Sequence, residues 1–272
     1  MLNRTYLSVI GGLLSLLMFV SCSDNPSSFS DSPPELPPAK SMQMDFSSFD
    51  SPQRKARTLS GGYYNFSKAS GMTFMLNRIA GDNLDKSFTL YEAADQAEPE
   101  FNDDGNWVWS YSRSADGKNY AIKLKASRIS GQDVNWNLYV SNPEEGLSNH
   151  LLFSGKANTE GTKGSWDLYN MDDTESKDPG SQVVWELANN DQADLRLNVL
   201  SNDSSEGDYI EYSYDGQIKN VVYFDSRKSI TTEMQINTET QQGYILADDY
   251  NDGKKACWDK DLQDTPCDGE AE

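Results

Sequence analysis

Alternation of apolar and polar residues from Asn106 onward restricts the fold of this chain more than any other feature. The clearest runs are residues 122–127, 195–199 and 230–237, in which a largely apolar set of side chains alternates with a polar set. Successive side chains of a strand point to opposite faces, so each run predicts a strand with one face in the core and one in water. Asp-Gly pairs between such runs predict tight hairpin turns. We expect about ten strands between residues 106 and 246, and we expect them to be antiparallel because no helical pattern interrupts them.

Residues 53–100 carry a different period. Apolar residues recur at intervals of three or four over 63–79 and again over 84–94, which is typical of amphipathic helices. Gly81-Asp82-Asn83 is expected to end the first helix, and Pro99 follows the second. The sequence therefore predicts a mainly β (α+β) fold. Its sheet is expected to be curved and antiparallel, or a barrel-like meander, with the N-terminal helical segment packed on it.

Three tryptophans share a local motif within the alternating region. Trp136, Trp166 and Trp185 each precede a leucine by two positions, at intervals of 30 and 19 residues. These intervals have no fixed period, so they do not indicate a repeat architecture. Residues two apart on a strand point the same way, and we expect all three tryptophans to share one core.

The first twenty-two residues have the composition of an export signal. Arg4 precedes an apolar run over 6–20, and Ser21 and Cys22 follow that run. Phe19-Val20-Ser21-Cys22 resembles the lipobox of bacterial lipoproteins, with Phe19 in place of the commonest leucine. In that family, signal peptidase II cleaves before the cysteine, whose sulfur carries a diacylglycerol. An uncleaved membrane helix is one alternative, although fifteen residues are fewer than the roughly 20 that a span needs; ordinary secretion is another.

The resemblance implies a place for the mature protein. Cleavage after Ser21 would leave Cys22 as a lipidated N-terminus, and two acyl chains make a stable membrane anchor. Ser23 after the cysteine is similar to the sorting signal of outer-membrane lipoproteins. We therefore expect an outer-membrane lipoprotein of the cell envelope, on the periplasmic face or the cell surface, with the membrane as its partner.

Composition divides the rest of the chain. Residues 22–52 are rich in Ser, Pro and Asp and predict an extended tether, near whose end Met42, Met44, Phe46 and Phe49 are expected to dock onto the domain. The full expected layout is a signal peptide at 1–21, a lipidated cysteine and tether at 22–52, a helical segment at 53–100, an antiparallel β domain at 101–254 and a C-terminal tail at 255–272.

Cleavage before Cys22 would leave two cysteines, Cys257 and Cys267. An even number of cysteines in an exported chain indicates a disulfide, which we expect to close the C-terminal tail. Two buried free thiols are the alternative. A redox role is not indicated, because the spacing is not C-x-x-C.

The inventory of reactive side chains predicts a protein that is not an enzyme. His150 is the single histidine and is expected in an exposed loop or at the start of a strand, so a Ser-His-Asp triad would have to form around it. With 43 acidic residues, no carboxylate pair for glycoside hydrolysis can be identified by spacing. A net charge of −20 argues against nucleic acid as a partner.

Metal binding has one candidate segment, and no other cofactor is expected. Asp248, Asp249 and Asp252 precede Gly253 in a segment that approaches a calcium loop. Tyr250 occupies a ligand position there, and the twelfth residue is an aspartate rather than the usual glutamate. A solvated turn is the alternative.

The strand that begins near Asn106 offers the best lead for a ligand. Trp107, Trp109 and Tyr111 alternate with small residues, so their rings share one face, where they either stack a sugar, line an apolar pocket or form the core of the sheet. We therefore expect a lipid-anchored envelope protein with a non-catalytic binding or structural role, whose partner is another envelope protein or a small ligand. The alternatives are a carrier or receptor for an apolar or carbohydrate ligand in the concave face of the sheet, and a glycoside hydrolase.

Overall fold

The structure, a computed structural model, describes residues 32–50, 62–129, 131–189, 192–201 and 204–267. The lipobox and Cys22 lie outside these residues. The chain from Ser32 onward groups into one compact unit.

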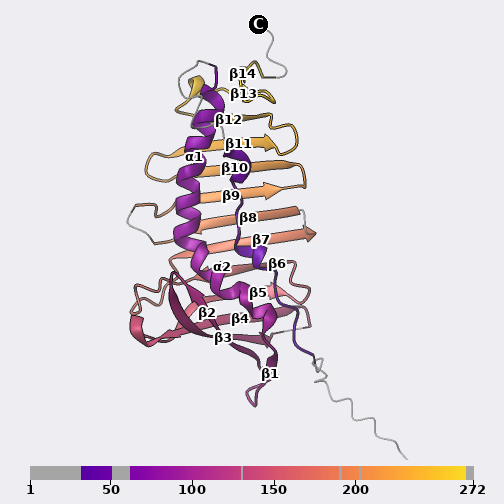
Figure 1. The fold of residues 1–272 in the computed structure, drawn as a ribbon, viewed down its shortest axis with the longest axis vertical. Coiled ribbons are helices and arrows are strands. Elements are labelled where there is room, and N and C mark those ends of the chain that lie inside the picture. The colour runs from indigo at the N-terminus through magenta and orange to yellow at the C-terminus, as the bar shows by residue number, and fades with distance from the viewer. Residues whose placement is uncertain (1–31, 51–61, 130, 190–191, 202–203, 268–272) are drawn as a thin grey trace, which may run out of the picture. The chain divides into compact units, whose positions relative to one another are not determined.

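Fourteen strands form one antiparallel sheet in which neighbours in the chain are neighbours in space (Figure 1). They are β1 (Pro99–Phe101), β2 (Trp107–Ala115), β3 (Lys118–Arg128), β4 (Asp133–Asn142), β5 (Leu147–Asn158), β6 (Lys163–Leu168), β7 (Ser181–Asn189), β8 (Gln192–Val199), β9 (Tyr209–Tyr214), β10 (Ile218–Asp225), β11 (Ile230–Asn237), β12 (Gly243–Ala247), β13 (Ala256–Trp258) and β14 (Asp264–Thr265). Strands hold 46% of the residues, which confirms a mainly β fold.

The expected number of about ten strands is wrong. Three of the additional strands, β1, β13 and β14, have only two or three residues and lie outside the alternating region. β1 and β14 are the two edges of the sheet, so within the described residues the sheet is open and not a barrel. The C-terminal tail continues the same sheet, because β13 pairs with β12 and β14 pairs with β13.

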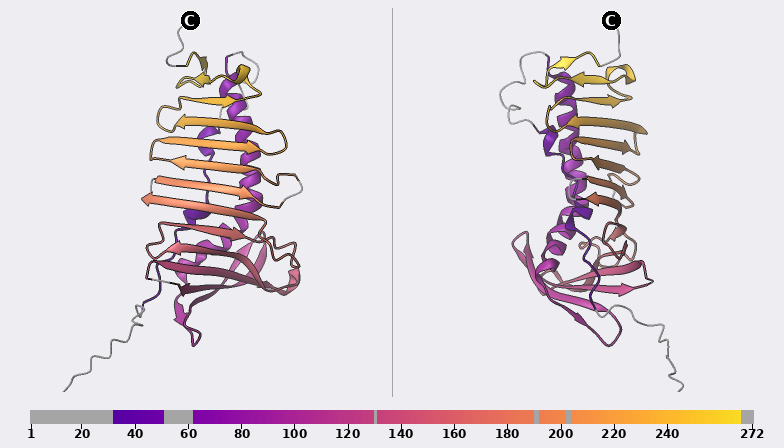
Figure 2. Two further views of the ribbon diagram at one scale, coloured as in Figure 1. Left: turned by 180° about the vertical axis from the view of Figure 1, so that it is seen from behind. Right: turned by 90° about the vertical axis from the view of Figure 1, so that its right-hand side faces the viewer.

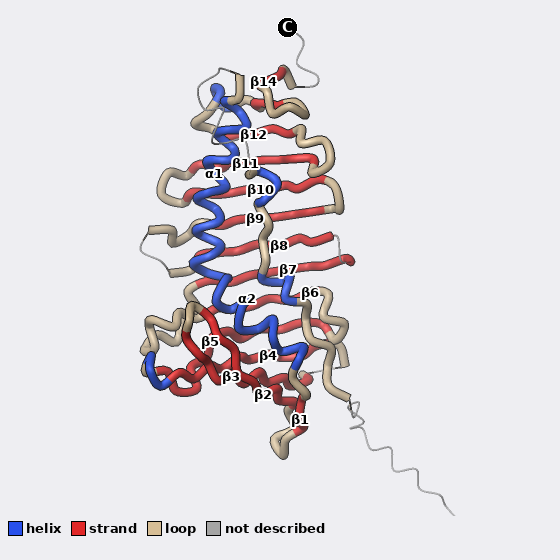
Figure 3. The backbone as a smooth tube through the Cα atoms, viewed as in Figure 1, coloured by secondary structure: helices blue, strands red, loops and turns tan. Residues whose placement is uncertain are grey.

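A single helical run of 33 residues crosses the strands (Figure 3). It consists of α1 (Tyr64–Ala80), a π-helical turn (Gly81–Asp85), α2 (Lys86–Tyr91) and a 3-10 turn (Glu92–Gln96). The expectation that Gly81-Asp82-Asn83 ends the first helix is therefore wrong. Ile79 and Leu84, five residues apart, are both buried, and a turn with i→i+5 hydrogen bonds keeps residues at that spacing on one side.

One face of the sheet, called the inner face, is covered by this helical run (Figure 2). α1 contacts β12, β13 and β14, and α2 contacts β2. Side chains of the inner face are buried, as Val221 and Tyr223 are on β10, whereas their neighbours Asn220 and Val222 point to the opposite, outer face. The inner face and the helical run together make one continuous core.

The N-terminal segment 32–50 is also part of this core. Met42, Phe46 and Phe49 are at most 1% exposed, and Met44 is buried as well, which confirms that these four residues dock. Trp166 donates a hydrogen bond from Nε1 to Ser41 Oγ at 2.9 Å. The stretch 22–52 assigned to an extended tether is therefore too long, because its described part packs on the sheet.

Tryptophans on the inner face lie over glycines of the adjacent strand. In three register pairs, Gly155–Trp166, Gly164–Trp185 and Gly243–Trp258, a Cβ added to the glycine would lie within 3 Å of the indole ring. The same Cβ would lie 2.1–2.2 Å from a carbonyl oxygen of the neighbouring strand. Only glycine fits these positions. The expectation of a shared core is confirmed for Trp136, Trp166 and Trp185, which are all at most 2% exposed.

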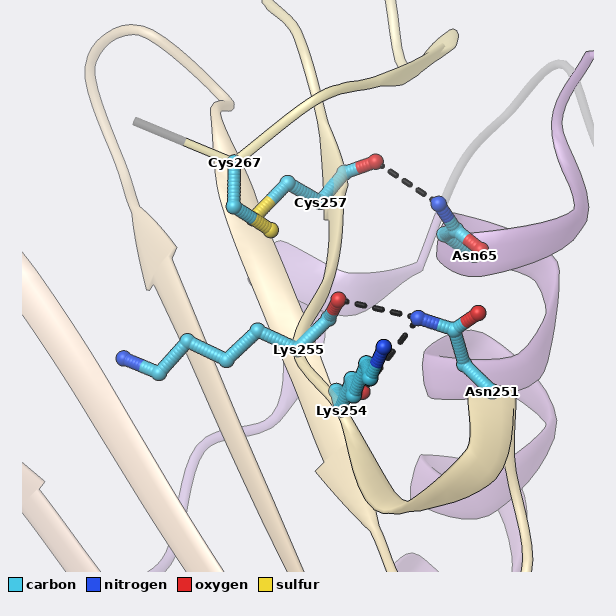
Figure 4. Close-up of a disulfide and its surroundings, with 6 residues drawn as sticks. All are labelled: Asn65, Asn251, Lys254, Lys255, Cys257 and Cys267. Carbon is cyan, nitrogen blue, oxygen red and sulfur yellow. Dashed lines mark hydrogen bonds between the residues drawn. A yellow bond between two sulfur atoms is a disulfide. The ribbon is translucent and has the colours of Figure 1, made fainter. Parts of the chain in front are cut away.

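The C-terminal strands hold the start of α1. Cys257 on β13 and Cys267 are joined through their sulfur atoms, with Cα atoms 5.3 Å apart, and this pair is called the C-terminal disulfide (Figure 4). Asn65 donates from Nδ2 to the carbonyl oxygen of Cys257 at 2.8 Å. Asp264 on β14 accepts hydrogen bonds from the backbone N–H groups of Tyr64 and Asn65 at 3.1 and 2.9 Å. An aspartate from the other end of the chain thus caps α1.

Candidate functional site

A polar cavity with a volume of about 790 Å³ lies beside the π-helical turn. One wall is the helical run over 77–89, and the other is formed by the β2–β3 turn and the β6–β7 connection. Its polar side chains are Asn77, Arg78, Asp82, Asn83, Asp85, Lys86, Ser87, Thr89, Asp116, Tyr169, Asn170, Asp172, Ser181 and Ser201. This set is called the polar cavity below.

The π-helical turn decides which side chains reach the polar cavity. Ile79 and Leu84 hold the turn against the core, which directs the polar residues between them outward. Asn83 donates from Nδ2 to the carbonyl oxygen of Ile79 at 2.7 Å. Asp85 lies over Gly81, since a Cβ at Gly81 would be 3.0 Å from Asp85 Oδ2. π-Helical turns are frequent at functional sites, so this turn supports a functional role for the wall that it forms.

Charges of both signs line the polar cavity. Lys86 Nζ lies 3.2 Å from Asp116 Oδ2, and Arg78 Nε lies 3.9 Å from Asp82 Oδ2. These pairs are largely exposed and contribute little to stability. Their groups are consequently available to a ligand. Together with the amides they offer many hydrogen-bond donors and acceptors at short spacing.

A second cavity of about 650 Å³ lies on the outer face of β6–β10. Arg196 and Glu211 form an ion pair across two strands in this groove, between Val184 and Val222. The guanidinium carbon of Arg196 also lies 3.9 Å from the ring centre of Tyr209. The groove is an open depression in which Arg196 and Glu211 are already paired with each other, so these two groups are less available to a ligand.

The aromatic residues of β2 pack in the core or against it. Trp109 is 2% exposed and lies 5.6 Å from the ring of Trp136. Trp107 is half-buried against Phe101, with ring centres 5.1 Å apart. Tyr111 donates from its hydroxyl to the carbonyl oxygen of Leu90 at 2.9 Å, and burial raises the pKa of Tyr111 well above its ordinary value. None of the three residues lines the cavities described above, so their expected role in binding a ligand stays a prediction without support from a cavity.

The acidic segment after β12 lies at the surface. Asp248, Asp249 and Asp252 are exposed, and Asp249 pairs with Lys68 at 3.9 Å. Tyr250, at the expected ligand position, donates instead to Asn65 Oδ1 at 2.8 Å. Within the described residues, no group of three or more His, Cys, Asp or Glu side chains is arranged to hold a metal ion.

His150 lies within β5 and lines a third cavity of about 430 Å³ together with Tyr169 and Lys177. Sequence reasoning placed this histidine in a loop or at a strand start. It also missed the polar cavity, because it expected Gly81-Asp82-Asn83 to end a helix. The dense run of polar residues over 77–86 was the available signal.

Searches of known protein families, curated protein sequences and solved structures found no match to this chain. Over the residues that the structure describes, no helix is both long and apolar enough to cross a membrane.

Proposed function

We propose that this chain is a lipid-anchored protein of the cell envelope whose folded part binds a ligand without catalysing a reaction. The resemblance of residues 19–22 to a lipobox supports the location. The observation that carries the binding role is the polar cavity, whose volume of about 790 Å³ lies in the range of small-molecule sites.

A carbohydrate is the ligand class that best fits the polar cavity. Amides such as Asn77 and Asn170, carboxylates such as Asp85 and Asp172, and the Tyr169 hydroxyl can each bond to sugar hydroxyl groups. An apolar ligand on the inner face of the sheet is less well supported, because the helical run and the N-terminal segment already fill that face.

The anchor is tested by metabolic labelling with a fatty-acid probe. We expect the wild-type chain to be labelled and to fractionate with membranes, and Cys22→Ala to lose both properties. A labelled Cys22→Ala variant, or an unlabelled wild-type chain in the membrane fraction, would contradict lipidation at this cysteine.

The binding role is tested with the full chain and a panel of envelope glycans by isothermal titration calorimetry. Asn77→Ala and Asn170→Ala should weaken binding about tenfold or more, since each removes hydrogen bonds to the ligand. Asn135→Ala is the matched control, because Asn135 is exposed on the outer face of β4, away from the polar cavity. Equal affinities of all three variants would refute the site. Cleavage of a bound oligosaccharide, detected by mass spectrometry, would refute the non-catalytic role.

A further inference from the structure

The polar cavity is lined by more acidic than basic side chains. Its charged residues are Asp82, Asp85, Asp116, Asp172, Arg78 and Lys86. Arg78 and Lys86 each pair with one of these aspartates. The other two, Asp85 and Asp172, form no ion pair with any side chain of the described residues. The cavity therefore holds two carboxylates whose charge no basic side chain balances.

The surroundings of the polar cavity do not reverse this balance. The β6–β7 connection, residues 169–180, holds four acidic residues and one lysine. Arg113 and Lys118, on either side of the β2–β3 turn, are paired with Glu92 and Glu145. A positively charged group of a ligand is therefore attracted into the cavity, and a negatively charged group is repelled.

Two buried serines also line the polar cavity, one from each side. Ser87 on α2 is 3% exposed, and Ser181 on β7 is 2% exposed. Ser181 lies on the same side of β7 as the fully buried Val183, so its side chain points toward the helical run. Neither hydroxyl has a hydrogen-bond partner among the residues that the structure describes, and neither oxygen is sealed from solvent, so both face the cavity. Buried polar groups nearly always have a partner, which indicates that a polar group of a ligand bonds to these hydroxyls.

We propose that the ligand of the polar cavity is a glycan that carries free amino groups. This inference rests on the proposed function and narrows its class of carbohydrate. An ammonium group has three donors and no acceptor, whereas carboxylates and hydroxyls can accept. Asp85 lines the cavity from the helical run and Asp172 from the β6–β7 connection, so an ammonium group meets acceptors on both walls. A glycan without an amino group leaves both carboxylates without a counter-charge.

The proposal is tested by isothermal titration calorimetry of the full chain at pH 6, where amino groups with a pKa of about 7.7 are protonated. The probes are a glucosamine oligomer and the same oligomer after N-acetylation, which removes the charge and keeps the sugar rings. We expect the glucosamine oligomer to bind at least about tenfold more tightly, because hydrogen bonds between ionised groups are the stronger ones.

Matched charge variants locate the amino group. Asp85→Asn and Asp172→Asn should each weaken binding of the glucosamine oligomer about tenfold and leave binding of the acetylated oligomer unchanged. Asp248→Asn is the control, because it removes the same charge from the exposed turn after β12 and should leave both affinities unchanged. Ser181→Ala should weaken binding of the glucosamine oligomer about fivefold without lowering the midpoint of urea unfolding, because the hydroxyl has no partner in the free protein.

Four outcomes would overturn the proposal. Equal affinity for the two oligomers, while Asn77→Ala weakens both, would refute the amino group and leave the proposed function intact. An equal loss of affinity in Asp248→Asn would reduce the effect to general attraction by an acidic chain, and unchanged affinity of Ser181→Ala would remove the buried hydroxyl from the site. Calcium that competes with the glucosamine oligomer in the wild type but not in Asp85→Asn would assign the carboxylates to a metal ion. Absence of binding to every glycan would refute this inference and the proposed function together.

Discussion

Replacing Asp264 by Ala should destabilise the protein by removing the cap of α1. Tyr63, the residue before α1, supplies no side-chain cap, and the Asp264 carboxylate instead accepts from the first two backbone N–H groups of the helix, at 3.1 and 2.9 Å. Loss of an N-cap costs about 1 kcal/mol. Loss of a negative charge at the positive end of the helix dipole costs a further ~0.5 kcal/mol. We therefore expect the free energy of unfolding to fall by about 1.5 kcal/mol.

The assay is urea unfolding followed by far-UV circular dichroism and tryptophan fluorescence. Asp264→Ala should lower the midpoint at an unchanged m-value, and should speed hydrogen exchange at the N–H groups of Tyr64 and Asn65. Asp264→Asn is the matched control, because it keeps one of the two acceptor oxygens and loses the charge and the other hydrogen bond, and it should cost about 1 kcal/mol, less than Asp264→Ala. The reasoning would be refuted by an Asp264→Ala variant as stable as the wild type, or by the two variants losing equal stability.

Three further outcomes are expected. Gly164→Ala should lower the free energy of unfolding in urea by at least about 2 kcal/mol, because the added Cβ would lie 2.2 Å from a carbonyl oxygen of the adjacent strand. Gly71→Ala should raise the free energy of unfolding by about 0.5–1 kcal/mol, because the backbone is helical there and the added Cβ meets open space. Equal effects of the two substitutions would contradict the packing at Gly164. Burial raises the pKa of Asp45, but hydrogen bonds from Lys219 and Ser47 outweigh burial and lower that pKa below 3.8. The resulting stability is present above pH 3.8 and is lost as the pH falls through the lowered pKa, so Asp45→Asn should flatten the acid limb of the stability–pH curve, and an unchanged limb would contradict this. Reduction of the C-terminal disulfide should lower stability by about 2–3 kcal/mol, and free thiols found in the mature chain by non-reducing mass spectrometry would show that the bond does not form.

Much of the sheet could be predicted from local periodicity. Alternation in β3, β8 and β11 identified which side chains face the core, because neighbouring side chains of a strand point to opposite faces whatever the partner strand is. The same reasoning placed Trp136, Trp166 and Trp185 in one core. It undercounted the strands, since β13 and β14 are too short to show an alternation and exist only because β12 offers an edge to pair with.

The candidate site was much less predictable. A glycine followed by polar residues at 81–83 is a local signal for a helix end. The structure continues the helix through these residues because Ile79 and Leu84 both pack into the core, and tertiary packing outweighs a weak local preference. The opposite wall comes from loops about 30 and 90 residues further along the chain, around Asp116 and Asp172. No local pattern reports that these segments meet.

The sequence by itself determined the class of the fold, the faces of the strands and the residues of segment 32–50 that enter the core, because each depends on the polarity of side chains along a short stretch of chain. Only the tertiary structure decided that the sheet stays open and that Asp264 caps a helix 200 residues earlier. These features depend on which distant segments pack together, and the free energy of that packing is a property of the whole core rather than of any window of sequence.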